Sequence, residues 1–133
     1  MTDAEALVRR YLREAWEVAD PSAVDTLLAD GYVDHDAPPG IGPTRADQRR
    51  AVERLREATR ERSVRIVKLH ACGGAVTVRH DSRWVQVAPL FGIPGDGRRV
   101  LVRGCDLYVV AGGRIAESWH AESVTTEPTS TSG

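Results

Sequence analysis

The residues best suited to chemistry are two histidines and two aspartates in two parts of the chain. His35 and Asp36 are adjacent, whereas Asp106 and His120 lie in the C-terminal half. A histidine titrates near neutral pH and can exchange protons with a substrate. A carboxyl group in an apolar pocket resists ionisation, so it can stay protonated and donate a hydrogen bond. Acid–base groups held in this way suit enolisation, aldol ring closure, double-bond migration or epoxide opening.

Each of these residues also has a purely structural interpretation. His120 fits a hydrogen-bonded, partly buried histidine, and Asp106 fits a structural aspartate. Asp34, His35 and Asp36 precede a Pro-Pro loop, where aspartates commonly form turns and caps. The same three residues resemble half of a metal site, but no second cluster has ligand spacing, so we expect no metal.

The composition favours a globular domain that binds neither nucleic acid nor a membrane. The 133 residues suffice for one domain, and 18 Lys and Arg nearly balance 19 Asp and Glu. Two cysteines, Cys72 and Cys105, are too few for a disulfide framework and fit no zinc spacing. No apolar run approaches the roughly 20 residues that span a bilayer. The acidic start is unlike a signal peptide, so we expect a cytoplasmic protein.

Helical periodicity dominates the first half of the chain. The predicted helices cover residues 3–19, a short segment that begins at Pro21 and ends before Gly31, and residues 45–61. Asp3 is the expected N-cap of the first helix. Thr44 and Asp47 form a capping-box variant before the third helix.

From residue 63 the period changes to two, which predicts a run of strands. They cover residues 64–71, 75–87, 98–110 and 114–123, with Gly-Gly hairpin turns at 73–74 and 112–113. Helices followed by an antiparallel meander form an α+β pattern in which helices cover one face of the sheet. We expect a single domain over residues 1–124 and a disordered tail over residues 125–133.

Strand parity predicts which side chains face inward. One face of the strand over 75–87 is largely apolar with polar residues toward its end: Val76, Val78, His80, Ser82, Trp84 and Gln86. Buried polar groups are costly without partners, so this face predicts a cavity rather than a solid core. For residues 98–110, the simplest assignment leaves Asp106 in water, and the opposite assignment is equally open. For the strand over residues 114–123, parity does not decide which of the two faces points inward.

Four stretches of the sequence resemble the SnoaL-like polyketide cyclases. This family belongs to the nuclear-transport-factor-2-like superfamily, which also contains the steroid isomerases. The stretches are ADGYVDHD at 29–36, FGIPGDGR at 91–98, GCDLY at 104–108 and GRIAESW at 113–119. The resemblance covers about residues 5–123.

The resemblance implies a cone-shaped α+β fold, in which a curved antiparallel sheet wraps around three N-terminal helices and leaves an internal pocket. It implies that Asp106 stands where steroid isomerases carry an oxyanion-stabilising carboxylic acid, and Asp36 where they carry the general base. The residue after the family tryptophan, here His120, lines the pocket, and the similar cyclases often carry an acid/base aspartate there. Ser118 and Glu122 then also face inward.

Two departures from the family pattern leave the reaction type open. The cyclases commonly have Gly-Thr-His before the Gly-Ile-Pro loop, whereas this chain has Trp84-Val85-Gln86. His120 replaces the usual aspartate.

From these observations we expect a cofactor-free acid–base enzyme, of the cyclase, lyase or isomerase type, that acts on a small apolar, polyketide-like carbonyl compound. The predicted catalytic residues are His120 and Asp106, supported by His35 or Asp36. The predicted substrate-binding residues are Trp16, Tyr32, His80, Trp84, Gln86, Tyr108, Ser118 and Glu122. The resemblance also implies a homodimer.

Two alternatives stay open. One is an epoxide hydrolase of the same fold, which requires Asp36, Asp106 or Glu122 to converge on one water. The other is a non-catalytic module for ligand binding or dimerisation. An enclosed cavity that holds both Asp106 and His120 would favour an enzyme.

Overall fold

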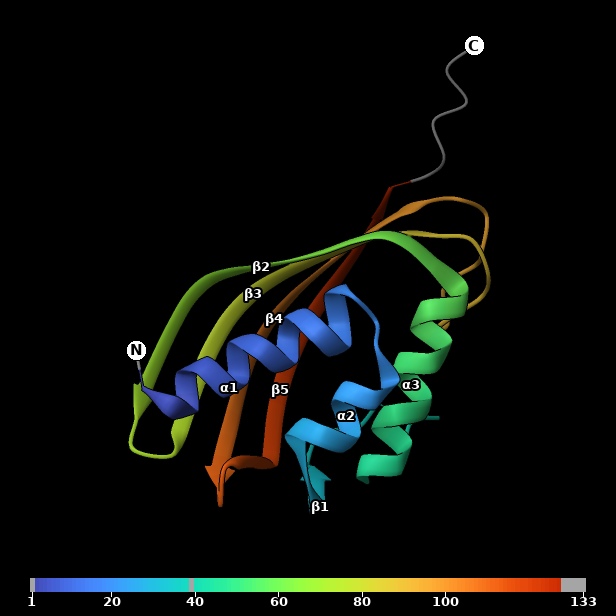
Figure 1. The fold of residues 1–133 in the computed structure, drawn as a ribbon. Helices are drawn as coiled ribbons and strands as arrows, with labels where there is room; N and C mark the ends of the chain where they lie inside the picture. Colours follow the sequence, from blue (N-terminus) through green and yellow to red (C-terminus); the bar gives the residue numbers. More distant parts are fainter. Residues whose placement is uncertain (1, 39, 128–133) are drawn as a thin grey trace.

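A curved five-stranded sheet wraps around helices in the computed structural model, which describes residues 2–38 and 40–127 (Figure 1). The elements are α1 (Asp3–Tyr11), the π-helical segment η1 (Leu12–Glu17), α2 (Pro21–Leu27), β1 (Leu28–Asp34), α3 (Arg45–Ala58), β2 (Thr59–Cys72), β3 (Ala75–Gln86), β4 (Arg99–Ala111) and β5 (Arg114–Glu127). The strand order is β1-β5-β4-β3-β2. This confirms the predicted α+β fold, although β1 and β2 remain edges and the sheet does not close into a barrel.

The first predicted helix is present, but it changes from an α-helix to a π-helix after Tyr11. α1 begins after Thr2, whose hydroxyl accepts a hydrogen bond from the Glu5 amide at 3.1 Å, so Thr2 rather than Asp3 is the N-cap. From Leu12 the chain continues as η1, a π-helical segment of a kind often found at functional sites. Ala19, with a positive φ of 59°, ends this run.

The second and third helices both end earlier than predicted. α2 stops at Leu27, because Leu28 is already extended and pairs with Ile115 of β5. Gly31 therefore lies within β1 and does not terminate a helix. α3 opens with the predicted capping box of Thr44 and Asp47, but Thr59 already starts β2.

The four long strands form an antiparallel meander, and β1 adds to β5 in parallel. Positive φ angles at Gly73, Gly112 and Gly113 allow the two predicted hairpin turns. β5 continues to Glu127, into the segment predicted as a tail. The rest of that predicted tail, 128–133, lies outside the described residues.

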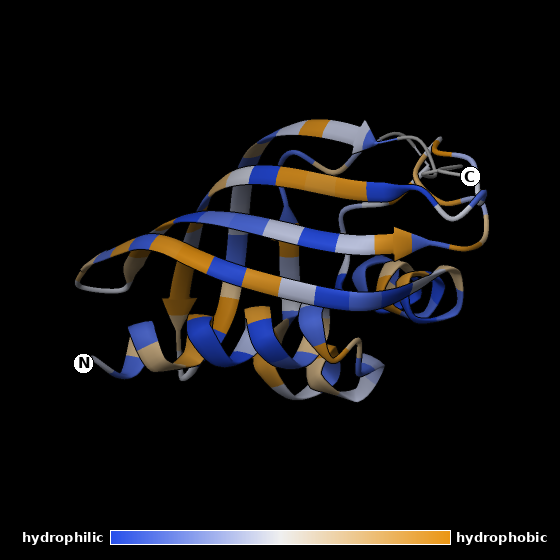
Figure 2. Cartoon of the chain, turned by 90° about the horizontal axis from the view of Figure 1, so that it is seen from above, coloured by the Kyte–Doolittle hydropathy of each residue, from blue (hydrophilic) through white to orange (hydrophobic). Residues whose placement is uncertain are grey.

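The inner face of the sheet packs on the helices and forms the core. Alternating hydrophobic and hydrophilic residues along the strands are visible from above (Figure 2). On β3, the predicted inward set is buried or partly buried, whereas Thr77 and Arg83 on the other face are exposed. On β4, Asp106 and Tyr108 are buried and Cys105 is exposed, so the simplest assignment from the sequence is wrong for this strand.

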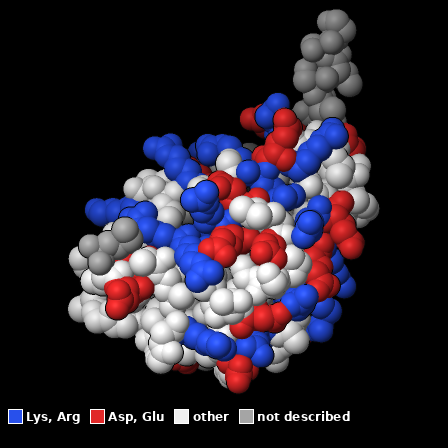
Figure 3. Space-filling model, viewed as in Figure 1, with Lys and Arg blue, Asp and Glu red and all other residues white. Residues whose placement is uncertain are grey.

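The surface carries charges of both signs. Arg and Lys side chains alternate with Asp and Glu over the face in Figure 3. No helix among the described residues is both long and apolar enough to cross a membrane.

Candidate active site

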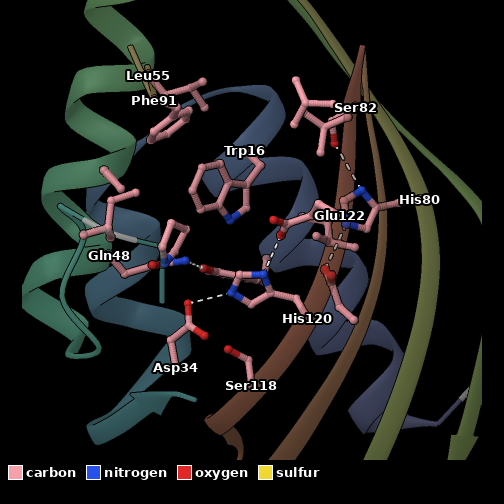
Figure 4. Close-up of a pocket in the computed structure, with 18 of the residues that line it drawn as sticks. Trp16, Asp34, Gln48, Leu55, His80, Ser82, Phe91, Ser118, His120 and Glu122 are labelled. Carbon is pink, nitrogen blue, oxygen red and sulfur yellow. Dashed lines mark hydrogen bonds and ion pairs between the residues drawn. The ribbon is translucent and has the colours of Figure 1, made fainter. Parts of the chain in front are cut away.

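A pocket of about 670 Å³ lies between the helices and the inner face of the sheet. Trp16, Gln48 and Leu55 line its helical side, and polar side chains of β3, β4 and β5 contribute to the opposite side (Figure 4). The lining includes most of the predicted binding residues, namely Trp16, Tyr32, His80, Trp84, Tyr108, Ser118 and Glu122, together with the predicted catalytic residues Asp106 and His120.

His120 is held between two carboxylates. Its Nε2 lies 2.9 Å from Asp34 Oδ2, and its Nδ1 lies 2.5 Å from Glu122 Oε1 (Figure 4). The hydrogen bond to Asp34, followed by that to Glu122, raises the pKa of His120 to about 10, although burial opposes this. The imidazole is therefore a cation at neutral pH.

Asp34 is anchored in turn by the backbone. Its Oδ1 accepts a hydrogen bond from the Asp36 amide at 2.9 Å, while Oδ2 faces His120. The Asp34 side chain is only 3% exposed, whereas that of Glu122 is 33% exposed. Glu122 is thus the partner of His120 that an incoming ligand can displace more easily.

Asp106 forms a second polar cluster in the same pocket. Its Oδ2 accepts a hydrogen bond from the Tyr108 hydroxyl at 2.8 Å and lies 2.9 Å from His80 Nε2. Its Oδ1 is buried and has no hydrogen-bond partner in the described part of the chain. A buried polar atom without a partner is unusual in a folded protein and marks Asp106 as a candidate functional residue.

Asp106 and His120 are direct neighbours across β4 and β5 but do not pair with each other. Their Cα atoms are register partners in the antiparallel ladder, and both side chains line the pocket. Each ionisable side chain instead bonds to other residues: His120 to Asp34 and Glu122, Asp106 to residues of β3 and β4. The pocket therefore holds two separate ionisable clusters where we expected one pair.

Three buried tyrosines contribute neutral hydroxyl groups to this region. Tyr32 shares a 2.6 Å hydrogen bond with Ser118. The Tyr11 hydroxyl accepts a hydrogen bond from Gln48 at 3.2 Å, and its ring packs edge-on against Tyr108. Burial raises the pKa of Tyr11 to about 12, and it raises the pKa values of Tyr32 and Tyr108 as well, so all three stay protonated at neutral pH.

Two predicted catalytic residues are exposed and do not line the pocket. His35 stacks on Trp119 with ring centroids 4.2 Å apart, and its Nε2 lies 3.0 Å from Glu117. Asp36 accepts a hydrogen bond from the backbone amide of His120 at 2.9 Å. The reason is that β1 ends at Asp34, and in the turn that follows His35 and Asp36 lie outside the pocket, whereas Pro38, Gly40 and Ile41 line it again.

Gln86 is fully buried but ties a loop rather than lining the pocket. Its amide group donates to the carbonyl oxygens of Leu90 and Ile93 at 3.0 and 2.7 Å. Its Oε1 accepts a hydrogen bond from the Trp84 indole at 3.0 Å. Through these hydrogen bonds, Gln86 holds the loop between β3 and β4 against the end of β3.

The sequence analysis missed Asp34 as a pocket residue. Period two along β1 places Asp34 on the same face as Tyr32, which was predicted to face the pocket, so this signal was present. Tyr11 and Gln48 were missed as well, because a helical pattern does not distinguish core residues from pocket residues. Among the described residues, no group of three His, Cys, Asp or Glu is arranged to hold a metal ion.

Comparison with known proteins gives one family match and several structural likenesses. The family model described as SnoaL-like polyketide cyclase matches residues 6–126. The comparison with curated proteins gives no match.

Solved structures superpose over most of the chain. TsrD from Streptomyces laurentii is 25% identical, with a TM-score of 0.80, over 91% of this chain and 88% of that chain. IdmH from Streptomyces antibioticus is 21% identical, with a TM-score of 0.74, over 92% and 93%. An LEH-like epoxide hydrolase from M. tuberculosis is 20% identical, with a TM-score of 0.70, over 91% and 83%. The last two likenesses show the fold alone.

Proposed function

Because the chain belongs to the SnoaL-like polyketide cyclase family, we propose that it catalyses a cofactor-free acid–base reaction, of the cyclase or isomerase type, on a small, largely apolar carbonyl compound. The observation that carries this proposal is His120, held between two carboxylates inside a pocket that also contains Asp106. The pocket volume of about 670 Å³ falls within the range of small-molecule sites.

His120 stabilises negative charge that develops on the substrate oxygen. When the α-carbon of a carbonyl compound loses a proton, the oxygen becomes an enolate. A cation in a partly buried site interacts more strongly with that charge than a cation in bulk water does. Movement of the more exposed Glu122 frees Nδ1–H to donate to the oxygen, while Asp34 keeps the ring in place.

Asp106 accepts the proton from carbon. Its Oδ2 is already occupied by two donors, and its Oδ1 has no partner. Oδ1 is therefore the carboxylate atom without a donor, and a small rotation of the side chain presents it to a substrate C–H group. Asp106 then returns the proton at the position where the new bond or double bond requires it. These roles are the reverse of those that the family resemblance implies for Asp106 and His120, because the carboxylates around His120 keep it protonated.

Deuterium exchange at an activated carbon tests this proposal. The probe is 2-tetralone, a small apolar ketone with acidic α-protons, incubated with the protein in D₂O and followed by proton NMR. We expect exchange above background, with both His120→Gln and Asp106→Asn lowering its rate by about 100-fold.

The matched control is His70→Gln, because His70 is an exposed histidine on β2. This variant should exchange at the wild-type rate. Exchange no faster than background, or equal rates in His70→Gln and His120→Gln, would contradict the proposal. Binding of 2-tetralone without exchange would instead favour the non-catalytic ligand-binding module.

Epoxide hydrolysis is the second candidate. In its favour, three carboxyl groups line the pocket, those of Asp34, Asp106 and Glu122. It requires two of them to activate one water, yet Asp34 and Glu122 both bind His120 instead. Cyclohexene oxide in H₂¹⁸O is the test, because diol labelled with ¹⁸O that disappears in Asp106→Asn would favour the hydrolase.

A further inference from the structure

Ser82, His80 and Asp106 form a continuous line of hydrogen bonds along the sheet side of the pocket. The Ser82 hydroxyl lies 3.2 Å from His80 Nδ1, and His80 Nε2 lies 2.9 Å from Asp106 Oδ2 (Figure 4). All three residues line the pocket. The acid–base reaction proposed above uses neither Ser82 nor His80.

With Asp106 ionised, the proton of His80 is assigned to Nε2. A carboxylate only accepts, so Nε2 then donates to Oδ2, which also accepts from Tyr108. In the neutral ring, Nδ1 then carries the lone pair and accepts the Ser82 hydroxyl proton. This is the relation between hydroxyl, imidazole and carboxylate that activates a serine, with the two ring nitrogens exchanged.

The backbone of β4 is shaped to hold the His80 ring. Gly104 is the register partner of His80 across β3 and β4. A Cβ atom at position 104 would collide with Nε2 and Cε1 of His80. A residue without a side chain is thus needed at position 104 for the imidazole to lie where it does, and the His80 side chain is only 9% exposed.

Ser82 lies in apolar surroundings at the pocket wall. Its register partners on the neighbouring strands are Val64 and Val102. Its side chain shares the inward face of β3 with His80 and Trp84. Ser82 itself is only partly buried, so a molecule in the pocket can reach its hydroxyl.

We propose that Ser82 is a nucleophile that takes an acyl group from an ester entering the pocket, with His80 as its base and Asp106 orienting the ring. The Oγ–carbon bond forms while the Ser82 proton passes to His80 Nδ1. The bond from the acyl carbon to the alcohol oxygen then breaks, and His80 returns the proton to that oxygen. Water repeats the sequence on the acyl-serine and releases the acid. This activity goes beyond the acid–base reaction and shares only Asp106 with it.

Acylation by p-nitrophenyl acetate tests the proposal on the whole chain. Intact-mass spectrometry should show addition of one acetyl group, and peptide mapping should locate it on Ser82. Ser82→Ala should lose this label, whereas Ser123→Ala, at an exposed serine of β5, should keep it. Mapping also separates Ser82 from the other nucleophiles, Lys68, which is the only lysine, and the exposed Cys72 and Cys105.

The base is tested by His80→Gln, which should slow acetylation of Ser82 by about 100-fold. If circular dichroism shows that this variant is unfolded, Asp106→Asn serves instead and should also slow the acetylation. A wild-type protein that neither carries acetyl on Ser82 nor releases p-nitrophenol faster than Ser82→Ala overturns the proposal, and so does a labelling or release rate that folded His80→Gln leaves unchanged. His120→Gln separates this activity from the acid–base reaction, because proton exchange depends on His120 and acetylation of Ser82 does not.

Discussion

His120 and Asp106 were both predicted from the sequence, but their partners determine what each of them can do. A histidine without partners would have a pKa near 6.5 and would act as a base at neutral pH. Asp34 and Glu122 keep this one protonated, so it serves as a cation. No pattern in the sequence carries this information, because Asp34 and His120 are far apart along the chain and meet only when β1 pairs with β5.

Removal of the Tyr108 hydroxyl tests how far Asp106 depends on it. Tyr108→Phe leaves a buried carboxyl with one hydrogen bond fewer, and we expect a loss of about 1–3 kcal/mol in the free energy of unfolding. Tyr32→Phe is the matched control, because its hydroxyl pairs with the neutral Ser118 and should cost about 0.5–1.5 kcal/mol. Urea titrations measure both variants. A smaller cost for Tyr108→Phe than for Tyr32→Phe would contradict this account of Asp106.

A methyl group opposite the His80 ring should also be costly. In Gly104→Ala the new Cβ meets the ring, so His80 must move away from Asp106, and we expect a loss of about 1–3 kcal/mol in unfolding free energy. Gly31→Ala is the control, because a Cβ atom there has nothing within 4 Å. Urea unfolding measures the cost, and the imidazole NMR signals report the displacement. Equal stability of the two variants would mean that the ring is not confined.

Strand periodicity predicted many of the residues that line the pocket. Most of its errors arise where a strand ends or where both faces of a strand carry apolar residues. Along β3, the period of two correctly identified the inward face that contains His80 and Trp84. It could not decide between the faces of β4, because both carry apolar residues. Asp36 was expected in the pocket, but an extended pattern does not reveal that β1 ends at Asp34.

The loop between β3 and β4 illustrates a second limit. Gln86 continues the inward face of β3, so parity made it a candidate for substrate binding. Its amide instead bonds to carbonyl oxygens of a loop with no regular pattern. A buried glutamine that ties a loop cannot be distinguished by sequence from one that binds a ligand.

Gln86→Leu should loosen this loop. The substitution leaves the carbonyl oxygens of Leu90 and Ile93 and the indole N–H of Trp84 without their side-chain partner. We expect faster hydrogen–deuterium exchange across residues 87–98 and a loss of stability of about 1–3 kcal/mol. Gln48→Leu, on α3, is the matched control and should leave exchange in this loop unchanged. Unaltered exchange in Gln86→Leu would show that other contacts hold the loop.

The whole molecule should respond to pH through His120. Its pKa is higher in the folded chain, at about 10, than the ordinary value of 6.5, so the folded state binds this proton more tightly. The resulting stability is fully present below about pH 6.5 and disappears as the pH rises through about 10.

Urea unfolding between pH 6 and pH 10 measures this effect. The wild-type protein should lose stability as the pH rises, and His120→Gln should have a flatter profile. His70→Gln, which changes an exposed histidine, should follow the wild-type profile. Parallel profiles for wild type and His120→Gln would contradict the raised pKa.

The homodimer and the cytoplasmic location expected from the sequence stay predictions.

The parallel pairing of β1 with β5 also determines when the pocket can first exist. Asp34 enters the site from an early strand, and His120 and Glu122 enter it from the last strand of the meander. During synthesis the helices and the hairpin of β2 and β3 are translated before the histidine. A nascent chain therefore cannot bind its ligand early. Ligand binding can stabilise only chains in which all five strands are already paired.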